Sequence, residues 1–132
     1  MEEVVLESEP LCGLNLIIAN KIYEEASVCL EELYRNPSVD DMILIMKTLT
    51  TASALSELVK VNDKKVKGRE KKRIVVYVSH RLFKDFIHEM HLPRIRDAFE
   101  RVSDELIEIV IDFAKNNKVL RTISSQCSFL SC

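Results

Sequence analysis

Apolar residues recur every three to four positions along most of this 132-residue chain, which is the spacing of one face of an α-helix. The first such stripe covers about residues 11–35 and ends before Pro37. Ser38 and Asp41 then have the spacing of a capping box that opens a second helix. The pattern therefore predicts helices at about residues 11–35 and 39–61.

The second predicted helix is apolar or small on all sides, and Lys47 is its only charged residue between Asp41 and Glu57. A helix without a polar face is expected at the most enclosed position of a fold. Its run of threonine and serine, which includes Thr48, would allow a neighbouring backbone to approach closely, with hydroxyls bonded to carbonyls one turn back. We expect this helix to pack tightly in the core.

Two further helices are predicted in the second half of the chain. Residues 74–78, IVVYV, are typical of a β-strand when taken alone, but a longer stripe of helical spacing runs through about residues 72–91. After Pro93 a fourth stripe covers about residues 94–117, and it includes Ile109 and Phe113. The second half therefore indicates helix rather than sheet.

Four helices joined by short connections predict an all-α, antiparallel four-helix bundle that forms one domain over residues 1–132, with a short tail at 119–132. Ile107 and Ile111 fall on the charged side of the fourth predicted helix. An exposed apolar pair of this kind is a candidate contact between copies of the chain, so we expect a homo-oligomer interface there.

The composition, 47% hydrophobic and 30% charged, is that of a folded globular protein rather than of a disordered one. The acidic N-terminus does not resemble a signal peptide, and no uncharged apolar run reaches the ~18 residues of a membrane span. We therefore expect an intracellular protein, cytoplasmic or nuclear, without membrane contact.

The cysteines of the chain form no CxxC pair, which argues against a zinc site or a disulfide framework; they are Cys12, Cys29, Cys127 and Cys132. No metal or cofactor is expected.

Charge is distributed unevenly along the chain. Residues 60–96 hold twelve Lys or Arg and four Asp or Glu, a net charge of +8, whereas the rest hold seven and seventeen, a net charge of −10, for a total of −2. The densest run is KVNDKKVKGREKKR at residues 60–73. A positive charge near a helix N-terminus interacts unfavourably with the helix dipole. Stability alone therefore does not explain Lys71, Lys72 and Arg73 at the start of the third predicted helix.

The polar face of the third predicted helix continues this positive charge. Arg81 and Lys84 share that face with Tyr77 and with the histidines His80, His88 and His91. Loop and helix face together would form a basic strip that could follow a phosphate backbone, with Tyr77 as a stacking surface. The predicted nucleic-acid-binding residues are Lys64, Lys65, Lys67, Arg69, Lys71, Lys72, Arg73, Tyr77, Arg81 and Lys84.

These patterns predict a non-enzymatic helical accessory protein that contacts nucleic acid, either RNA or DNA, or a nucleoprotein assembly, through residues 60–91. The alternative is a protein–protein adaptor or regulator whose basic strip docks on an acidic surface of a partner or of a second copy. A lysine-rich connector can also be no more than a solvated loop.

A second alternative is catalysis on RNA. The segment RLFKDFIH places Arg81 and His88 seven positions apart, where the arginine could hold a phosphate while the histidine transfers a proton. This pair resembles the arginine–histidine signature of the HEPN ribonucleases, four-helix bundles that usually cleave RNA as dimers. Leu82 stands where that family typically has a polar residue, and no His-x-Tyr sequence follows. The resemblance implies a ribonuclease with Arg81 and His88 as its catalytic pair.

Overall fold

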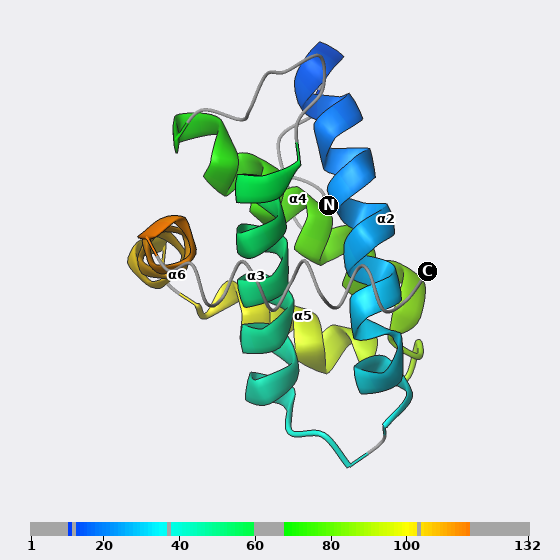
Figure 1. Ribbon diagram of the computed structural model, residues 1–132. Helices are drawn as coiled ribbons and strands as arrows, with labels where there is room; N and C mark the ends of the chain where they lie inside the picture. Colours follow the sequence, from blue (N-terminus) through cyan, green and yellow to red (C-terminus); the bar gives the residue numbers. More distant parts are fainter. Residues whose placement is uncertain (1–10, 12, 37, 60–67, 103, 117–132) are drawn as a thin grey trace.

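The computed structural model describes residues 11, 13–36, 38–59, 68–102 and 104–116. Within these residues the chain forms five α-helices, α2 (Gly13–Arg35), α3 (Asp41–Leu58), α4 (Gly68–Phe86), α5 (Leu92–Glu100) and α6 (Asp104–Asn116) (Figure 1). The described residues contain no strand, and residues 74–78 are helical. The all-α prediction is therefore confirmed. Among these helices, none combines the length and the apolar composition that crossing a bilayer requires.

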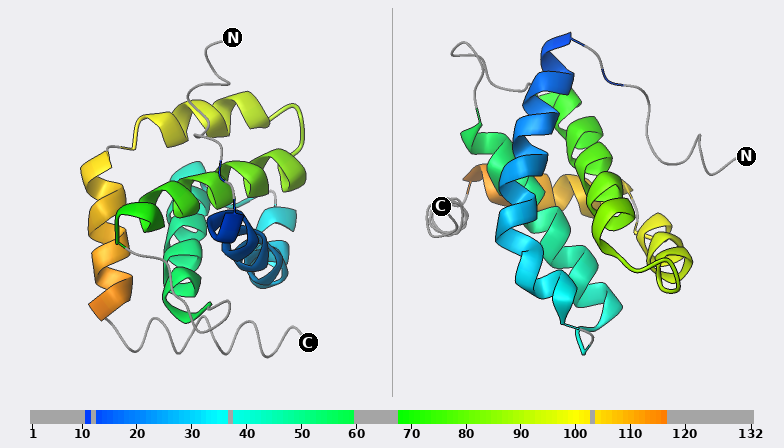
Figure 2. Two further views of the ribbon diagram at one scale, coloured as in Figure 1. Left: turned by 90° about the horizontal axis from the view of Figure 1, so that it is seen from above. Right: turned by 90° about the vertical axis from the view of Figure 1, so that its right-hand side faces the viewer.

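Three helices, α2, α3 and α4, lie side by side and run in alternating directions (Figures 1 and 2). The central element is α3, which contacts α2, α4, α5 and α6. This position explains why α3 has no polar face. The buried Thr48 hydroxyl donates to the Leu44 carbonyl at 2.8 Å, one turn back, as the sequence predicts for a buried hydroxyl in a helix. The same oxygen lies 2.7 Å from the hydroxyl of Tyr34 on α2.

The start of α3 differs from the prediction. Asp40 is the N-cap residue, and its side chain accepts a hydrogen bond from the Met42 amide at 2.9 Å. Such a cap stabilises a helix by about 1 kcal/mol. The Ser38 amide instead donates to the side chain of Asn36 at 2.9 Å, within the turn that follows α2. The predicted capping box between Ser38 and Asp41 is therefore wrong, because Asp40 caps the helix.

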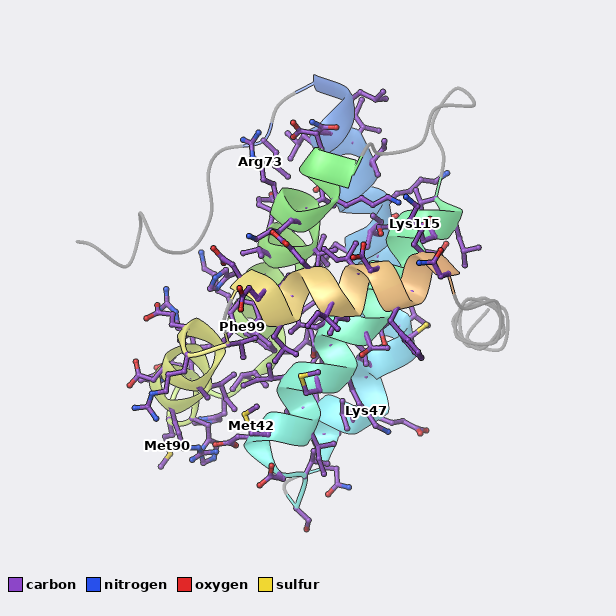
Figure 3. The ribbon with its side chains drawn as sticks, turned by 90° about the vertical axis from the view of Figure 1, so that its left-hand side faces the viewer. Met42, Lys47, Arg73, Met90, Phe99 and Lys115 are labelled. Carbon is purple, nitrogen blue, oxygen red and sulfur yellow. The ribbon has the colours of Figure 1, made fainter. Side chains whose placement is uncertain are left out.

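The predicted fourth helix is divided into α5 and α6. At the end of α5 the amides of Arg101 and Val102 donate to carbonyls three residues earlier, those of Ala98 at 3.2 Å and Phe99 at 3.0 Å. After this tighter turn, α6 lies across α3 and α4 instead of running alongside them (Figure 3). The observed arrangement is thus three aligned helices, with the short α5 packed against α3 and α4 and with α6 crossing α3 and α4, and not the predicted antiparallel four-helix bundle.

This break changes which face of α6 is buried. Ile107 and Ile111 are only 4% and 6% exposed, whereas Ile109 and Phe113 are 62% and 55% exposed. A single continuous helix would have buried Ile109 and Phe113. It would have left Ile107 and Ile111 facing the solvent. The prediction that Ile107 and Ile111 form an exposed contact between copies is therefore wrong, because their side chains lie in the core.

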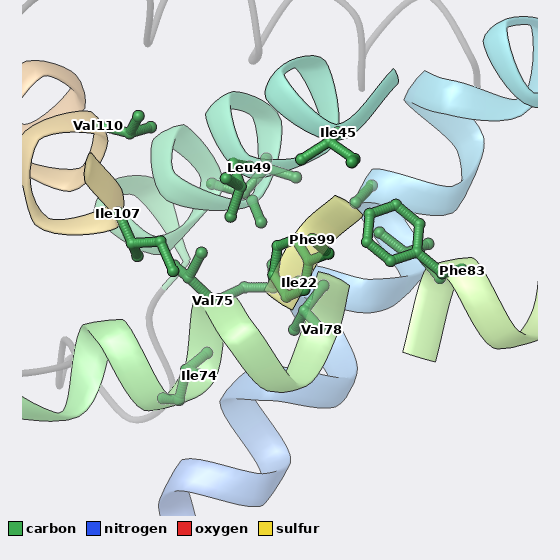
Figure 4. Close-up of a cluster of buried hydrophobic side chains, with 14 of the residues drawn as sticks. Ile22, Ile45, Leu49, Ile74, Val75, Val78, Phe83, Phe99, Ile107 and Val110 are labelled. Atoms are coloured by element: carbon green, nitrogen blue, oxygen red, sulfur yellow. The ribbon is translucent and has the colours of Figure 1, made fainter. Parts of the chain in front are cut away.

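The hydrophobic core forms where side chains from all five described helices converge (Figure 4). Ile22, Ile45, Leu49 and Phe83 are completely buried. Burying a side chain of this size stabilises the fold by about 1.5–3 kcal/mol. The Phe83 and Phe99 rings meet edge to face with their centroids 5.3 Å apart, which holds α5 against the C-terminal half of α4.

Candidate nucleic-acid interface

The predicted basic strip begins in a segment that lies outside the described residues. That segment, residues 60–67, carries Lys64, Lys65 and Lys67, and the side chain of Arg69 also lies outside the described part. Their contact with nucleic acid stays a prediction. The six other predicted residues all lie on α4.

The Lys71 side chain is buried in the fold instead of facing the solvent. Its side chain is 6% exposed and forms an ion pair with Glu57 of α3, whose side chain is 3% exposed. An ammonium group enclosed in this way is not available to a phosphate, so the assignment of Lys71 to the interface is wrong. The local pattern showed its charge but not its partner, which lies fourteen positions earlier in the chain.

Lys72 and Arg73 also form ion pairs within the fold. The Lys72 ammonium lies 3.4 Å from Asp104 and 3.3 Å from Glu108 of α6, and the Arg73 guanidinium lies 3.1 Å from Glu70 on its own helix. These carboxylates offset the unfavourable interaction of the cations with the N-terminus of α4. Stability therefore does account for the cations at the start of α4, contrary to the interpretation from sequence.

Farther along α4, the structure brings three of the predicted residues into one pocket. The pocket lies between α4 and α5 and has a volume of about 290 Å³. Its lining residues are Tyr77, His80, Arg81, Lys84, Asp85, Leu92 and Arg96. Three cationic side chains stand against one carboxylate, so the pocket has a net positive charge.

Arg81 is held in a defined position by groups on two helices. Its guanidinium donates to the side-chain oxygen of Asn20 on α2 at 2.7 Å and lies over the Tyr23 ring, 4.0 Å from the centroid. The Arg81 Nε also lies 4.0 Å from the Asp85 carboxylate. Its side chain is nevertheless 38% exposed. Because the guanidinium is already oriented, an anion that binds it orders little further side-chain motion.

Asp85 is the acidic residue of the pocket, and Tyr23 donates a hydrogen bond to its carboxylate at 2.5 Å. Burial, together with the hydrogen bond to Asp85, raises the pKa of Tyr23 to about 12. The phenol therefore remains a donor at neutral pH. The carboxylate is engaged with Tyr23 and Arg81 at the side of the pocket that meets α2.

His80 contributes a ring to the pocket. Its imidazole packs edge to face against Phe99 of α5, with the centroids 4.9 Å apart and the planes at 88°. Burial lowers the pKa of His80 to about 4, so the ring is neutral at physiological pH. A neutral imidazole offers one hydrogen-bond donor and one acceptor. With Tyr77 it gives the cationic pocket two aromatic walls.

The arginine–histidine pair predicted for catalysis does not share a helix face. The helix that carries Arg81 ends at Phe86 and not near residue 91, and His88 lies in the turn that follows. There the His88 Nδ1 accepts a hydrogen bond from the Met90 amide at 3.0 Å. His88 does not line the pocket that contains Arg81. The predicted alignment of the two side chains along one helix face is therefore wrong, because α4 ends before His88.

Leu92 and Arg96 belong to the pocket but were not identified as site residues from the sequence. They lie one turn apart on α5, on the side that meets α4. Arg96 ends the basic segment of the sequence, which was the available signal. Only the packing of α5 against α4 shows that it joins Arg81 and Lys84. Within the described ranges, no group of three His, Cys, Asp or Glu side chains is arranged to hold a metal ion.

Comparison of the chain with protein-family models, with curated proteins and with solved structures gives no match in any of the three. The function is therefore inferred from the geometry of the chain's own residues.

Proposed function

We propose that this protein is an intracellular, non-enzymatic helical accessory protein that contacts nucleic acid through the pocket between α4 and α5. The observation that carries the proposal is the convergence of Arg81, Lys84 and Arg96 with the rings of Tyr77 and His80. Cations bind the phosphate of a nucleic acid, and aromatic side chains stack on its bases. A pocket that presents both suits a phosphate together with an adjacent base.

The form of the pocket favours an unpaired nucleotide over a duplex. A concave site of about 290 Å³ encloses a small group instead of following a long backbone. In a duplex the bases are stacked on one another, whereas a single strand can direct a base onto an aromatic side chain such as Tyr77. The lysines at positions 64, 65 and 67, together with Arg69, would then extend the contact along the strand.

The proposal is tested by titrating the full-length protein with labelled single-stranded RNA, single-stranded DNA and duplex DNA at ~50 and ~200 mM salt. We expect the protein to bind single strands more tightly than duplex. The affinity should fall steeply with salt, because each phosphate contact releases a counterion. Lys84→Glu, at an exposed position of the pocket, should weaken binding about tenfold.

Lys47→Glu is the matched control for Lys84→Glu. It makes the same change of charge at an exposed position of α3 (Figure 3), and Lys47 does not line the pocket. It should weaken binding much less. Equal losses in the two variants would show that binding depends on net charge alone, and the pocket would not be the site. Absence of binding at ~50 mM salt would refute the nucleic-acid function. RNA cleavage that disappears in His88→Ala would instead identify a ribonuclease.

A further inference from the structure

The outer face of α6 presents large apolar side chains to the solvent. Ile109 and Phe113 are 62% and 55% exposed and lie one turn apart, so their side chains are neighbours on the helix surface. Leu106 continues this row toward the start of α6 and also lines a groove of about 570 Å³. The exposed apolar surface therefore extends from the last turns of α6 into a concave site.

This groove lies between the start of α3, one side of α5 and the start of α6. Its apolar lining consists of Met42, Ala98, Val102 and Leu106, and its charged lining consists of Asp41, Arg94, Asp97 and Arg101, two carboxylates and two cations. At the rim the Arg94 guanidinium donates to both carboxylate oxygens of Asp41, at 2.6 and 3.1 Å. The α5 residues that line the groove lie on the opposite side of that helix from Leu92 and Arg96. The groove and the cationic pocket are thus separate surfaces.

Acidic side chains lie along one edge of the apolar row on α6. Glu105 and Asp112 are exposed on the same outer side as Ile109 and Phe113, and Glu108 beside them already pairs with Lys72 of α4. In an antiparallel pair of α6 helices about a two-fold axis, the acidic row of one copy would face the acidic row of the other. That repulsion disfavours a second copy as the occupant. A partner that places cations beside an apolar stripe would complement both features.

We propose that the α6 surface, which is the groove together with Ile109 and Phe113, binds a basic amphipathic helix of a partner protein. From Leu106 to Phe113 the apolar row covers two turns, about 10 Å, and the groove extends it. This length suits the apolar anchors of a bound helix at positions i, i+3 or i+4, and i+7. The lysines or arginines of that helix lie along Glu105 and Asp112. This activity is independent of the nucleic-acid contact, because it uses other residues.

Fluorescence anisotropy of a labelled, stapled helical peptide tests the proposal. The peptide has about 15 residues, with leucines on one face and lysines and arginines on both flanks. A matched peptide carries the same leucines with glutamates on the flanks. We expect the full-length protein to bind the basic peptide and not the acidic one. The double variant Ile109→Ser, Phe113→Ser should weaken binding at least about tenfold. Glu105→Gln with Asp112→Asn should weaken it severalfold and reduce its salt dependence.

The control variant is Ile17→Ser with Val28→Ser, which removes two side chains of comparable exposure, 53% and 44%, from one face of α2. It should bind the basic peptide like the wild type. Three results would overturn the proposal: no binding of the basic peptide up to about 1 mM, unchanged binding by Ile109→Ser, Phe113→Ser, or equal binding of the acidic peptide. A wild-type dimer that this double variant converts to monomer would also overturn it, because a second copy would then cover the face.

Discussion

Glu57 and Lys71 are each 5% exposed, and their ion pair joins the C-terminal part of α3 to the N-terminal part of α4. Removal of either partner leaves an unpaired charge away from water, which costs about 3–5 kcal/mol. We expect Lys71→Leu or Glu57→Leu to lower the free energy of unfolding by that amount. The double variant should recover most of the loss, because a pair of apolar side chains can replace a buried ion pair. Urea denaturation of the three variants measures both effects.

Lys72→Leu is the natural control, since Lys72 is the next residue and contacts Asp104 and Glu108, whose side chains are largely exposed. Lys72→Leu should lower the free energy of unfolding by less than about 1 kcal/mol. If Lys71→Leu cost as little as Lys72→Leu, the pair between Glu57 and Lys71 would not be buried in solution.

His80 makes stability depend on pH. Burial lowers its pKa to about 4, from an ordinary value of about 6.5. Between these values the unfolded chain binds a proton that the folded protein does not, so lowering the pH through this window favours unfolding. We expect the wild type to lose up to about 1.4 kcal/mol per pH unit more than His80→Gln. Denaturation of both proteins at about pH 5 and about pH 7 measures the difference. If both proteins lost the same stability between these pH values, the His80 ring would be exposed to solvent.

At the scale of elements, α6 contains two apolar stripes of helical spacing. One consists of Leu106, Ile109, Val110 and Phe113, and the other of Ile107, Val110, Ile111 and Ala114. Periodicity cannot choose between them, and continuity with the preceding residues favours the first. The structure buries the second, because α6 starts afresh and crosses α3. The sequence Ser103-Asp104-Glu105 is typical of a helix start and was the available signal for the break.

Alanine substitutions distinguish the two stripes. Ile107→Ala and Ile111→Ala should each lower the free energy of unfolding by about 2–4 kcal/mol, because each leaves a cavity in the core. Ile109→Ala and Phe113→Ala should each change it by no more than about 0.5 kcal/mol, because both side chains are mostly exposed. Chemical denaturation of the four variants gives the ranking. The reverse order would indicate one continuous helix through α5 and α6.

At the scale of the whole molecule, α5 separates two surfaces of different character. On one side, Leu92 and Arg96 complete the cationic pocket with α4, and on the other, Ala98 contributes to the apolar groove with α3 and α6. Part of the charge asymmetry of the sequence is balanced internally, since Lys72 lies against acidic residues of α6. Within the described residues, Arg81, Lys84 and Arg96 meet at the cationic pocket. Taken together, the two proposals imply a protein that connects a nucleic acid to a protein partner.

The candidate site was only partly predictable from sequence. Tyr77, Arg81 and Lys84 share a helix face, and helical periodicity depends on neighbours within a few residues, so their common location followed from the sequence. Arg96 joins them through the packing of α5, and Asn20 positions Arg81 from sixty-one residues away. Contacts over such separations depend on how helices pack, which no local pattern contains.

The sequence by itself determined that this protein is helical, where its first helices lie, and that α3 is enclosed, because helix formation and apolar periodicity are local properties. Only the tertiary structure decided which face of α6 is buried and which cationic side chains form ion pairs within the fold. Both depend on distant partners, such as Glu57 for Lys71 and Asp104 for Lys72. A charged side chain has the same local pattern whether it faces solvent or a buried carboxylate, and packing alone separates the two.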